Sequence, residues 1–413
     1  MIGVEMTGVS GLVVRLTGAA IAAFVALAPV AVPAQEADTI AREAVIMDFD
    51  SGAVLFEKNG HEAMPPSSMS KLMTLNMLFE QLKDGRVKLT DTFPVSESAW
   101  REGGAGTDGS TMFAQLHSQI PVEALIQGIA VQSGNDACIV VAEGLAGTQA
   151  GFAETMNQRA KDLGMKESHF MNATGLPDPD HYMTAYDLAV LARHIIKTFP
   201  DYYHYFSEQE FTWNGIKQEN RNPLLYLNIG VDGLKTGHTA AAGFGLTASA
   251  VRGGQRLIIV VNGLESMKQR AEEPRRLLEM AFREYKTYPL YEANAKVDTA
   301  DVWNGAAGKV PLVTKQPIKA MMRRSVRPEM KVSVHYDGPL VAPIAEGQEV
   351  GSLEVSAPGA VTTTYPLYAG QAVKKVGPLG QIANTLVYLI NSRSSDPSAA
   401  ESPAPGGTET AKP

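Results

Sequence analysis

Residues 231–263, VDGLKTGHTAAAGFGLTASAVRGGQRLIIVVNG, decide the fold class, because they contain three apolar runs with the length of β-strands. The runs are 233–237, 244–251 and 256–263, and turn-forming residues separate them. Arg-Gly-Gly-Gln at 252–255 has the composition of a hairpin turn. Successive strands joined in this way indicate an antiparallel sheet.

A second pair of strands is predicted near the start of the chain. Residues 44–58 read AVIMDFDSGAVLFEK, two short strand-like runs around Asp50, Ser51 and Gly52, which is a hairpin composition. Between the two strand regions, apolar residues recur with helical spacing. The predicted helices are 68–83, 122–131, 136–146, 149–163 and one that begins at Thr184, where Thr-Ala-Tyr-Asp resembles a capping box. Strands at both ends of a helical block favour an α+β domain with an antiparallel sheet.

The composition changes after this domain. A helix from Pro274 to about Tyr285 closes it, and beyond Tyr288 short valine-rich runs such as 331–336 predict a small all-β domain. Residues 378–391 form an amphipathic pattern, with Leu379, Ile382, Leu386, Leu389 and Ile390 on one helical face. We expect the α+β domain at 35–288, a β-rich domain at 289–376, an amphipathic helix at 377–391 and a disordered tail at 392–413.

The first 34 residues have the pattern of a secretory signal peptide. Arg15 precedes an apolar run from Leu16 to Val32, and Ala34 follows two positions later. An uncleaved membrane anchor is the alternative, but the run is short, and Pro29 and Pro33 interrupt its end. We therefore expect cleavage near Ala34 and function outside the cytoplasm.

The composition excludes several classes of protein. With 413 residues, 45% of them hydrophobic, the chain can form two or three domains with a sizeable core. Its net charge of −8 has the wrong sign for gripping a phosphate backbone, so nucleic acid is not an expected partner. Cys138, the single cysteine, lies in an apolar helical run, which indicates a buried small hydrophobe. The histidines show no metal-ligand spacing, and we expect no metal or cofactor.

Two familiar motifs do not apply here. Residues 104–109, GAGTDG, match the letters of the dinucleotide-binding pattern G-x-G-x-x-G, which needs a strand before it and a helix beginning inside it. In this chain a polar loop precedes the motif and residues 111–115 look extended, so we interpret it as a flexible surface loop. No G-x-S-x-G occurs, which argues against an α/β-hydrolase nucleophile elbow.

Three short motifs remain: SMSK at 68–71, SGN at 133–135 and KTG at 235–237. Each is weak evidence alone. Together, in this order and at the junctions of predicted elements, they match the S-x-x-K, S-D-N and K-T-G set of penicillin-binding proteins and class A β-lactamases.

The spacing of the first motif suits nucleophilic catalysis. Residues three apart share a helix face, so Lys71 Nζ can reach Ser68 Oγ and accept its proton if burial and nearby positive charge keep the lysine neutral. Pro65 and Pro66 place Ser68 at the helix start, where its backbone N–H and the helix dipole suit an oxyanion. Ser70 turns off the shared face, and we expect Ser70→Ala to retain activity.

The other two motifs have side chains suited to handling a substrate. The Ser133 hydroxyl can relay a proton to a leaving amine, and Asn135 can orient a substrate amide. On the strand that carries Thr236, Lys235 supplies positive charge for a substrate carboxylate, and Gly237 lets a peptide backbone lie close.

With these motifs, the sequence resembles a low-molecular-mass penicillin-binding protein, a serine-type D-alanyl-D-alanine carboxypeptidase of the peptidase S11 family. Four longer stretches also look like this family: VQSGNDACIVVAEGLAG (131–147), MNQRAKDLGMKESHF (156–170), NRNPLLY (220–226) and VDGLKTGHTAAAGF (231–244). The resemblance covers roughly residues 40–390. It implies a β-lactamase/transpeptidase-like domain, a small β domain and an amphipathic helix.

The resemblance also implies a role for each matching residue. It makes Ser68 the acyl-ester nucleophile, Lys71 the proton acceptor, Ser133 a further active-site residue and Lys235 a substrate-binding residue. Arg221 matches a residue that helps to hold the terminal carboxylate, and the backbone N–H of His238 would be the second oxyanion donor. Asp187 and the acidic loop at 177–180 border this region, and we interpret them as a helix cap and a turn.

We therefore expect an exported enzyme that removes the terminal D-alanine from peptidoglycan stem pentapeptides and that β-lactam antibiotics acylate. One alternative is a β-lactamase, but the class A pattern E-x-x-L-N is absent between Asn135 and Lys235. The other is a catalytically silent wall-binding scaffold, which the intact motif set disfavours.

We expect the apolar face from Leu379 to Ile390 to hold the mature protein, in the periplasm, to the outer face of the inner membrane. Packing of this face against the β domain is the alternative. The family's helix is often basic and ends the chain, whereas here polar residues follow it and its core carries no Lys or Arg.

Overall fold

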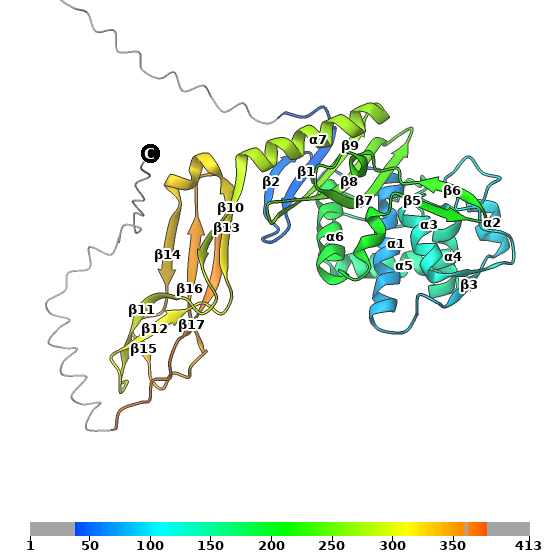
Figure 1. Cartoon of the computed structure of the whole chain (residues 1–413). Coiled ribbons are helices and arrows are strands. Elements are labelled where there is room, and N and C mark those ends of the chain that lie inside the picture. Colours follow the sequence, from blue (N-terminus) through cyan, green and yellow to red (C-terminus); the bar gives the residue numbers. More distant parts are fainter. Residues whose placement is uncertain (1–37, 360–361, 378–413) are drawn as a thin grey trace, which may run out of the picture. The chain divides into compact units, whose positions relative to one another are not determined.

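The computed structural model describes residues 38–359 and 362–377 (Figure 1). The predicted signal peptide at 1–34, the amphipathic stretch from residue 378 and the tail at 392–413 lie outside the described residues. Within the described ranges, no helix has the length and apolar character needed to cross a membrane.

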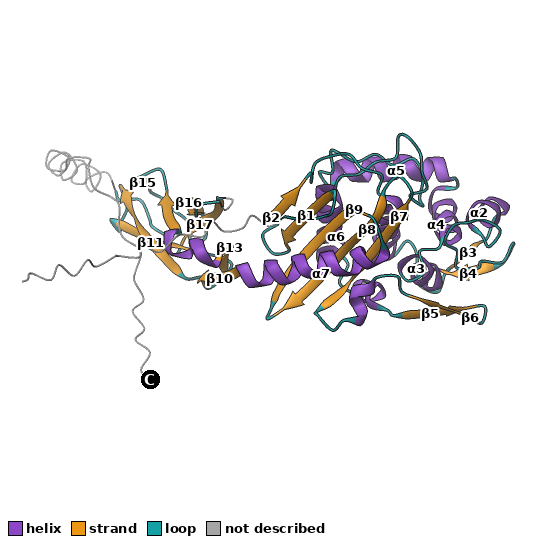
Figure 2. Cartoon of the chain, turned by 90° about the horizontal axis from the view of Figure 1, so that it is seen from above, coloured by secondary structure: helices purple, strands orange, loops and turns teal. Residues whose placement is uncertain are grey.

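A five-stranded antiparallel sheet forms the centre of the first domain (Figure 2). Its strands are β1 (Glu43–Asp48), β2 (Val54–Lys58), β7 (Val231–Thr239), β8 (Gly243–Arg252) and β9 (Gln255–Leu264), in the order β2-β1-β9-β8-β7. The three runs of residues 231–263 are therefore neighbours in space, and Arg252 lies opposite Gln255 at the predicted turn. The antiparallel α+β arrangement predicted from this stretch is confirmed.

A block of helices lies between β2 and β7 in the sequence. It contains the 3-10 turn η1 (Ser67–Ser70) and the helices α1 (Lys71–Lys83), α2 (Glu97–Gly103), α3 (Val122–Ala130), α4 (Asn135–Ala146), α5 (Gln149–Asp162) and α6 (Ala185–Thr198). Short elements complete it: η2 (Tyr203–Ser207), η3 (Pro223–Tyr226), the hairpin β3 (Thr92–Pro94) with β4 (Gln119–Pro121), and the hairpin β5 (Glu210–Trp213) with β6 (Ile216–Glu219). The helices predicted at 122–131, 136–146, 149–163 and after Thr184 are confirmed.

Helices cover both faces of the central sheet. Along β9, Ile258 and Val260 belong to the core of the helical block, and Leu257 and Ile259 between them are also fully buried. Because successive side chains of a strand point to opposite faces, both faces must be covered. Helix α6 packs against β1 and β9, and α7 (Met267–Glu284) packs against β8 and β9 (Figure 2).

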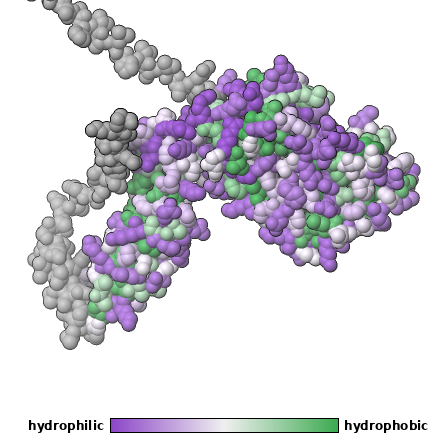
Figure 3. Space-filling view, viewed as in Figure 1, coloured by the Kyte–Doolittle hydropathy of each residue, from purple (hydrophilic) through white to green (hydrophobic). Residues whose placement is uncertain are grey.

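Helix α7 begins at Met267 and not at Pro274, where the sequence placed its start. The Ser266 side chain caps it by accepting a hydrogen bond from the Gln269 N–H at 3.2 Å. Proline favours the first turn of a helix, but Pro274 lies inside this one because the stronger cap precedes it. Hydrophilic residues cover the outward face of α7 (Figure 3).

The glycine-rich segment at 104–109 follows a helix, so the polar loop expected before it was wrong. Helix α2 ends at Gly103, and the Ser96 hydroxyl caps its start by accepting from the Ala99 N–H at 2.9 Å. Residues 111–115, which looked extended, lie in a loop. The dinucleotide motif is excluded as expected, because a helix and not a strand leads directly into these glycines.

The second domain is built from β-strands, as predicted. Strands β10 (Tyr285–Tyr291) and β13 (Ile318–Arg323) form a two-stranded sheet. A second sheet has six strands, in the order β14 (Lys331–His335), β16 (Glu349–Ser356), β17 (Thr363–Ala369), β12 (Lys309–Val313), β11 (Lys296–Trp303) and β15 (Leu340–Val341). The 3-10 turn η4 (Arg324–Glu329) precedes β14. Ala300, Leu312 and Leu353 are fully buried in its core. Because β10 begins at Tyr285 and pairs within this domain, we propose that the domain starts there.

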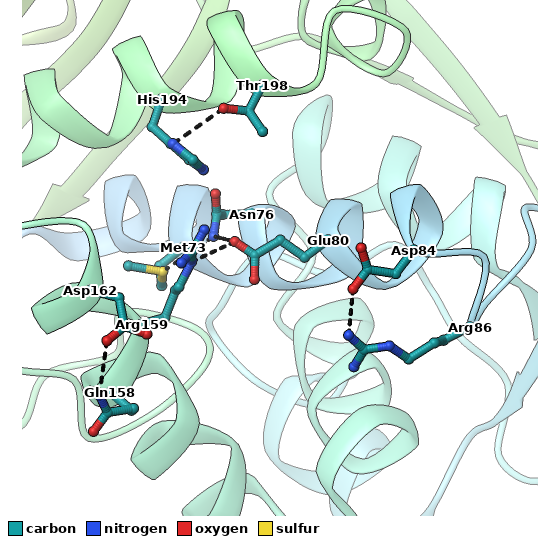
Figure 4. A network of polar contacts seen from close by, with 10 residues as sticks. All are labelled: Met73, Asn76, Glu80, Asp84, Arg86, Gln158, Arg159, Asp162, His194 and Thr198. Carbon is teal, nitrogen blue, oxygen red and sulfur yellow. Dashed lines mark hydrogen bonds and ion pairs between the residues drawn. The ribbon is translucent and has the colours of Figure 1, made fainter.

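Polar contacts join α1 to α5, and a further contact lies within α6 (Figure 4). The Glu80 carboxylate accepts from Arg159 Nε at 2.6 Å and from Asn76 Nδ2 at 3.0 Å. On α6, His194 Nδ1 lies 3.3 Å from Thr198 Oγ1. The Glu80–Arg159 ion pair therefore ties the second half of α1 to α5.

Candidate active site

Ser68 lies in the 3-10 turn η1, so the helix predicted from Ser68 begins with a tighter turn than expected. In a 3-10 turn, side chains three residues apart eclipse each other, which places Lys71 in line with Ser68. Lys71 Nζ lies 2.8 Å from Ser68 Oγ. Ser67, Met69 and Ser70 are buried, whereas Ser68 is partly exposed. The turn thus presents one hydroxyl, already hydrogen-bonded to an amine.

The Lys71 side chain is fully buried, and its hydrogen-bond partners are uncharged. They are the Ser68 hydroxyl and the Thr174 carbonyl oxygen. Burial lowers the pKa of Lys71 to about 8, and the Arg221 guanidinium acts in the same direction. The Cys138 thiol is also fully buried, which confirms its interpretation, and burial raises its pKa to about 12. Lys71 can therefore lose its proton near physiological pH and act as a base.

Ser133 and Asn135 flank the start of α4. The Ser133 backbone has φ 68°, in the left-handed region, and no hydrogen-bond partner for its buried Oγ is present among the described residues. The Asn135 N–H donates to the Ser110 carbonyl at 2.7 Å. A buried hydroxyl without a hydrogen-bond partner costs free energy. A substrate group that hydrogen-bonds to Ser133 Oγ would remove this cost and so bind more tightly.

Strand β7 carries the third motif along the edge of the sheet. Lys235 is 2% exposed, and its Nζ donates to the Thr236 carbonyl at 3.3 Å. Burial holds the pKa of Lys235 well below its usual value, and the charges of Lys71 and Arg221 add to this effect. His238 stacks on Phe244, with the ring centroids 3.9 Å apart.

Gly237 allows β7 to approach the nucleophile turn. A Cβ atom at this position would lie 2.8 Å from the Pro66 carbonyl oxygen and 3.2 Å from the Ser67 Cβ. The end of the strand adds a hydrogen bond to the same turn, since Ser67 Oγ lies 3.0 Å from Thr239 Oγ1. The sequence suggested that this glycine makes room for the backbone of a substrate peptide. The structure adds a second reason, because a side chain here would also crowd the nucleophile turn of the protein itself.

The predicted residues converge on one cleft of about 830 Å³. Its lining includes Ser68, Ser133, Asn135, Arg221, Thr236, Gly237 and His238. Lys71 and Lys235 are buried next to these residues and do not line the cleft. No group of His, Cys, Asp or Glu suited to holding a metal ion occurs in the part of the chain that the structure describes.

Two guanidinium groups from different elements lie on this cleft. Arg221 Nη1 donates to Ser110 Oγ at 2.5 Å. Arg270, on α7, is 9% exposed and lies over the Phe244 ring at 5.4 Å. Burial lowers the pKa of Arg270 to about 10, and Arg221 contributes in the same direction. The sequence analysis missed Arg270, because it belongs to no motif and precedes Pro274, where the helix was predicted to begin.

Asp136 is a second residue that the sequence analysis missed. Its fully buried carboxylate accepts from Thr111 Oγ1 at 2.6 Å, from the Met112 N–H at 2.9 Å and from the Ala114 N–H at 3.0 Å. These bonds hold the loop that supplies Ser110 to the cleft. An acidic residue in the first turn of a mostly apolar helix was the available signal.

The acidic residues beside the cleft have structural partners, as interpreted. Thr184 caps α6 by accepting from the Asp187 N–H at 3.1 Å, and the Asp187 carboxylate accepts from Ser168 Oγ at 2.8 Å. The capping-box resemblance was therefore half right, because the Asp187 side chain holds the preceding loop. In the acidic loop, Asp178 Oδ1 accepts from the Asp180 N–H at 2.9 Å, which is a turn contact.

Comparisons with known proteins agree across both domains. Residues 30–266 match the D-alanyl-D-alanine carboxypeptidase family model, and residues 285–375 match that of the penicillin-binding protein 5 C-terminal domain. The chain is 39% identical to D-alanyl-D-alanine carboxypeptidase DacD of Escherichia coli over 332 residues, 80% of this chain and 86% of the relative. It is 35% identical to DacA of Haemophilus influenzae over 380 residues, covering 90% and 96%. The crystal structure of penicillin binding protein 5 from Haemophilus influenzae is similar, with a TM-score of 0.75, 36% identity and coverage of 82% and 99%.

Proposed function

The chain belongs to the D-alanyl-D-alanine carboxypeptidase family, and we propose that Ser68 and the residues around it carry out the family's reaction. It is a serine-type D-alanyl-D-alanine carboxypeptidase that works through an acyl-enzyme and is acylated by penicillins. One observation supports Ser68 as the nucleophile above the others: Ser68 lines the cleft, and its Oγ lies 2.8 Å from the buried Lys71 Nζ. A nucleophile and a base within hydrogen-bond reach are what acyl transfer requires.

In the proposed acylation step, Ser68 Oγ attacks the carbonyl carbon of the peptide bond between the two D-alanines. Its proton passes to the neutral amine of Lys71, and the carbonyl electron pair moves onto oxygen. The backbone N–H groups of Ser68 and His238 would stabilise this oxyanion. Their positions agree with this role, because both residues line the cleft, one on η1 and the other on β7.

The tetrahedral species then collapses, the C–N bond breaks, and the departing D-alanine takes a proton. We assign the relay of this proton from Lys71 to Ser133, whose buried hydroxyl would pass its own proton to the amine and take up the one held by Lys71, and which lies on the cleft without a partner among the described residues. Asn135, beside it, would hold the substrate amide. Water finally hydrolyses the Ser68 ester and releases the shortened peptide.

The free carboxylate of the terminal D-alanine would bind at the cationic end of the cleft. Arg221 and Arg270 both line this end, whereas Lys235 is buried behind Thr236. A guanidinium can form two parallel hydrogen bonds with a carboxylate, and the Thr236 hydroxyl can add another. Burial lowers the pKa of Lys235, but a bound carboxylate would favour its charged form, and the ammonium group would then add positive potential behind Thr236.

The first test is the intact mass of the protein after brief incubation with a penicillin. A stable adduct on wild type, absent from Ser68→Ala, supports the proposed nucleophile. Rapid return to the free mass would instead indicate a β-lactamase, and no adduct at all would indicate a silent scaffold.

Amidation of the terminal D-alanine tests carboxylate recognition. The amide should be a much poorer substrate than the acid for wild type, and the difference should shrink in Arg221→Ala, Lys235→Ala and Arg270→Ala. An equal preference for the acid in all four proteins would remove these residues from that role.

We also propose that the enzyme acts in the periplasm, at the surface of the inner membrane. Its relatives are cell-wall enzymes of bacteria, and the spacing of apolar residues from Leu379 to Ile390 suits an in-plane helix. A chain that ends at Val376 should stay active and no longer float with liposomes. The anchor is refuted if the full-length mature protein does not float with liposomes.

A further inference from the structure

Residues 171–181, here called the clasp segment, lie directly against the nucleophile turn. Thr74 Oγ1 donates to the Ala173 carbonyl at 2.7 Å, and Lys71 Nζ donates to the Thr174 carbonyl. The clasp segment thus covers the first turn of α1 on the side of the proposed base. None of its side chains takes part in the acylation scheme above.

The fit between the clasp segment and the turn is close. A Cβ atom at Gly175 would lie 1.9 Å from the Ser67 carbonyl oxygen, so only glycine fits there. At the end of the segment, His181 Nε2 lies 2.9 Å from Ser70 Oγ. Both residues are buried, with His181 4% and Ser70 0% exposed. Ser70 therefore has a partner that its position between Ser68 and Lys71 did not suggest.

The hydrogen bonds of His181 show which ring nitrogen carries the proton. The Met171 N–H points at Nδ1 from 3.3 Å, so Nδ1 accepts and Nε2–H donates to the Ser70 hydroxyl. Burial lowers the pKa of His181 to about 4, Asp178 opposes this effect, and His169 and Lys71 reinforce it. The imidazole is therefore neutral, and this donor is present throughout the neutral and alkaline range.

We propose that His181 is a positioning residue for acylation: through Ser70 it holds the clasp segment against the nucleophile turn and keeps water away from Lys71. The inference rests on the proposed role of Lys71 as the base. His181 does not line the cleft, so it acts without touching substrate.

The expected consequence is a change in the proton affinity of Lys71. Its pKa is low chiefly because the amine is buried, and a loosened clasp segment would let water stabilise the charged form. The other groups that face Lys71 are Asp136 and Cys138 from α4, Arg221, and Lys235 from β7, and they stay in place in this change. Each unit of increase in pKa lowers the neutral fraction at pH 7 about tenfold.

The experiment measures the rate of penicillin acylation against pH for matched variants. His181→Asn keeps an acceptor near the Nδ1 position and loses the contact with Ser70, whereas the longer amide of His181→Gln can still reach Ser70. Ser70→Ala removes the contact from the other side. We expect Ser70→Ala and His181→Asn to shift the profile to higher pH by about one unit, with an about tenfold slower rate at pH 7. The contact with His181 thus revises the sequence-based expectation for Ser70→Ala, which should keep the wild-type rate only at high pH. We expect His181→Gln to keep the wild-type profile.

His169→Gln is the control from the chain just before the clasp segment, because His169 is half-buried and its Nδ1 bonds to the Asp180 carbonyl and not to the turn. It should leave the profile unchanged. The apparent pKa does not depend on how much protein is folded, so a partly unfolded variant remains informative. If His181→Asn does not fold, Ser70→Ala decides the question.

Unshifted profiles in both Ser70→Ala and His181→Asn would overturn the inference and leave the contact a purely structural one. A shift to lower pH would also overturn it, because the lost Thr174 carbonyl would then matter more than entering water. Failure of wild type to form any penicillin adduct is a different result, since it refutes the proposed function itself.

Discussion

The two ends of helix α1 differ in how an ionisable side chain is surrounded: one end holds an ion pair, and the other a buried amine with no counter-charge. Toward its C-terminal end, Glu80 pairs with Arg159 at 2.6 Å, and the two side chains are 21% and 27% exposed (Figure 4). At its N-terminal end, Lys71 is fully buried among uncharged partners, and burial lowers its pKa to about 8. An ion pair can hold two helices together. A buried amine without a carboxylate partner is less stable in its charged form, so it gives up its proton more easily and can act as a base.

The difference also explains why the tight packing around the N-terminal end matters. Burying an unpaired amine away from water costs free energy, so the packing around it must be tight enough to keep it buried. Helix α4, strand β7 and the clasp segment all contact this region. The C-terminal end needs no such support, because its charges neutralise each other.

The largest effect is expected at the N-terminal end. Ser68→Ala should abolish penicillin labelling and D-alanine release, and Lys71→Arg should slow acylation by about 10²–10⁴-fold, because a guanidinium keeps its proton at any working pH. Intact-protein mass and D-alanine assays measure both outcomes. Wild-type acylation by Lys71→Arg would mean that another group is the base.

The second effect is on pH dependence. Because the pKa of Lys71 is about 8, the acylation rate should rise about tenfold per pH unit below that value and level off above it. A pH series of acylation rates with one penicillin checks this. A rate that does not change below pH 8 would show that Lys71 is not the titrating base.

The third effect is on stability. Lys71→Met should abolish acylation but raise the free energy of unfolding at neutral pH by about 1–2 kcal/mol, because it removes the burial of a charged amine. Between the folded pKa of about 8 and the unfolded value of 10.5, the unfolded wild type binds more protons, so wild-type stability rises with pH and the advantage of Lys71→Met shrinks. Urea unfolding at several pH values measures this. The exposed Lys83→Met, in the last turn of the same helix, is the control and should show no such pH-dependent gain.

The smallest effect is expected at the C-terminal end. Glu80→Gln leaves Arg159 without its counter-charge and should lower the free energy of unfolding by about 1 kcal/mol, with acylation unchanged. The exposed pair of Glu279 with Arg275 on α7 is the control, and Glu279→Gln should cost less. A large loss of acylation in Glu80→Gln would break the contrast between the two ends of α1.

Much of the fold could be predicted because its signals are local. Alternating and helical apolar patterns, together with the turn at 252–255, were sufficient for the sheet, the helices and the all-β domain. The same holds for the three motifs, two of which lie where a helix or turn begins and the third within strand β7. The start of α7 was misjudged because Pro274 looked like a first-turn residue, and this error concealed Arg270.

The sequence by itself determined which residues could react: a serine three positions before a lysine, a serine and asparagine at a helix start, and a lysine on a strand. Only the tertiary structure decided that they share one cleft, that Lys71 has a lowered pKa and that Ser70 is bonded to His181. The physical reason is that side-chain order along an element follows from local geometry. Burial, in contrast, depends on segments far apart in the chain, here η1, the clasp segment, α4 and β7, packing together around one amine.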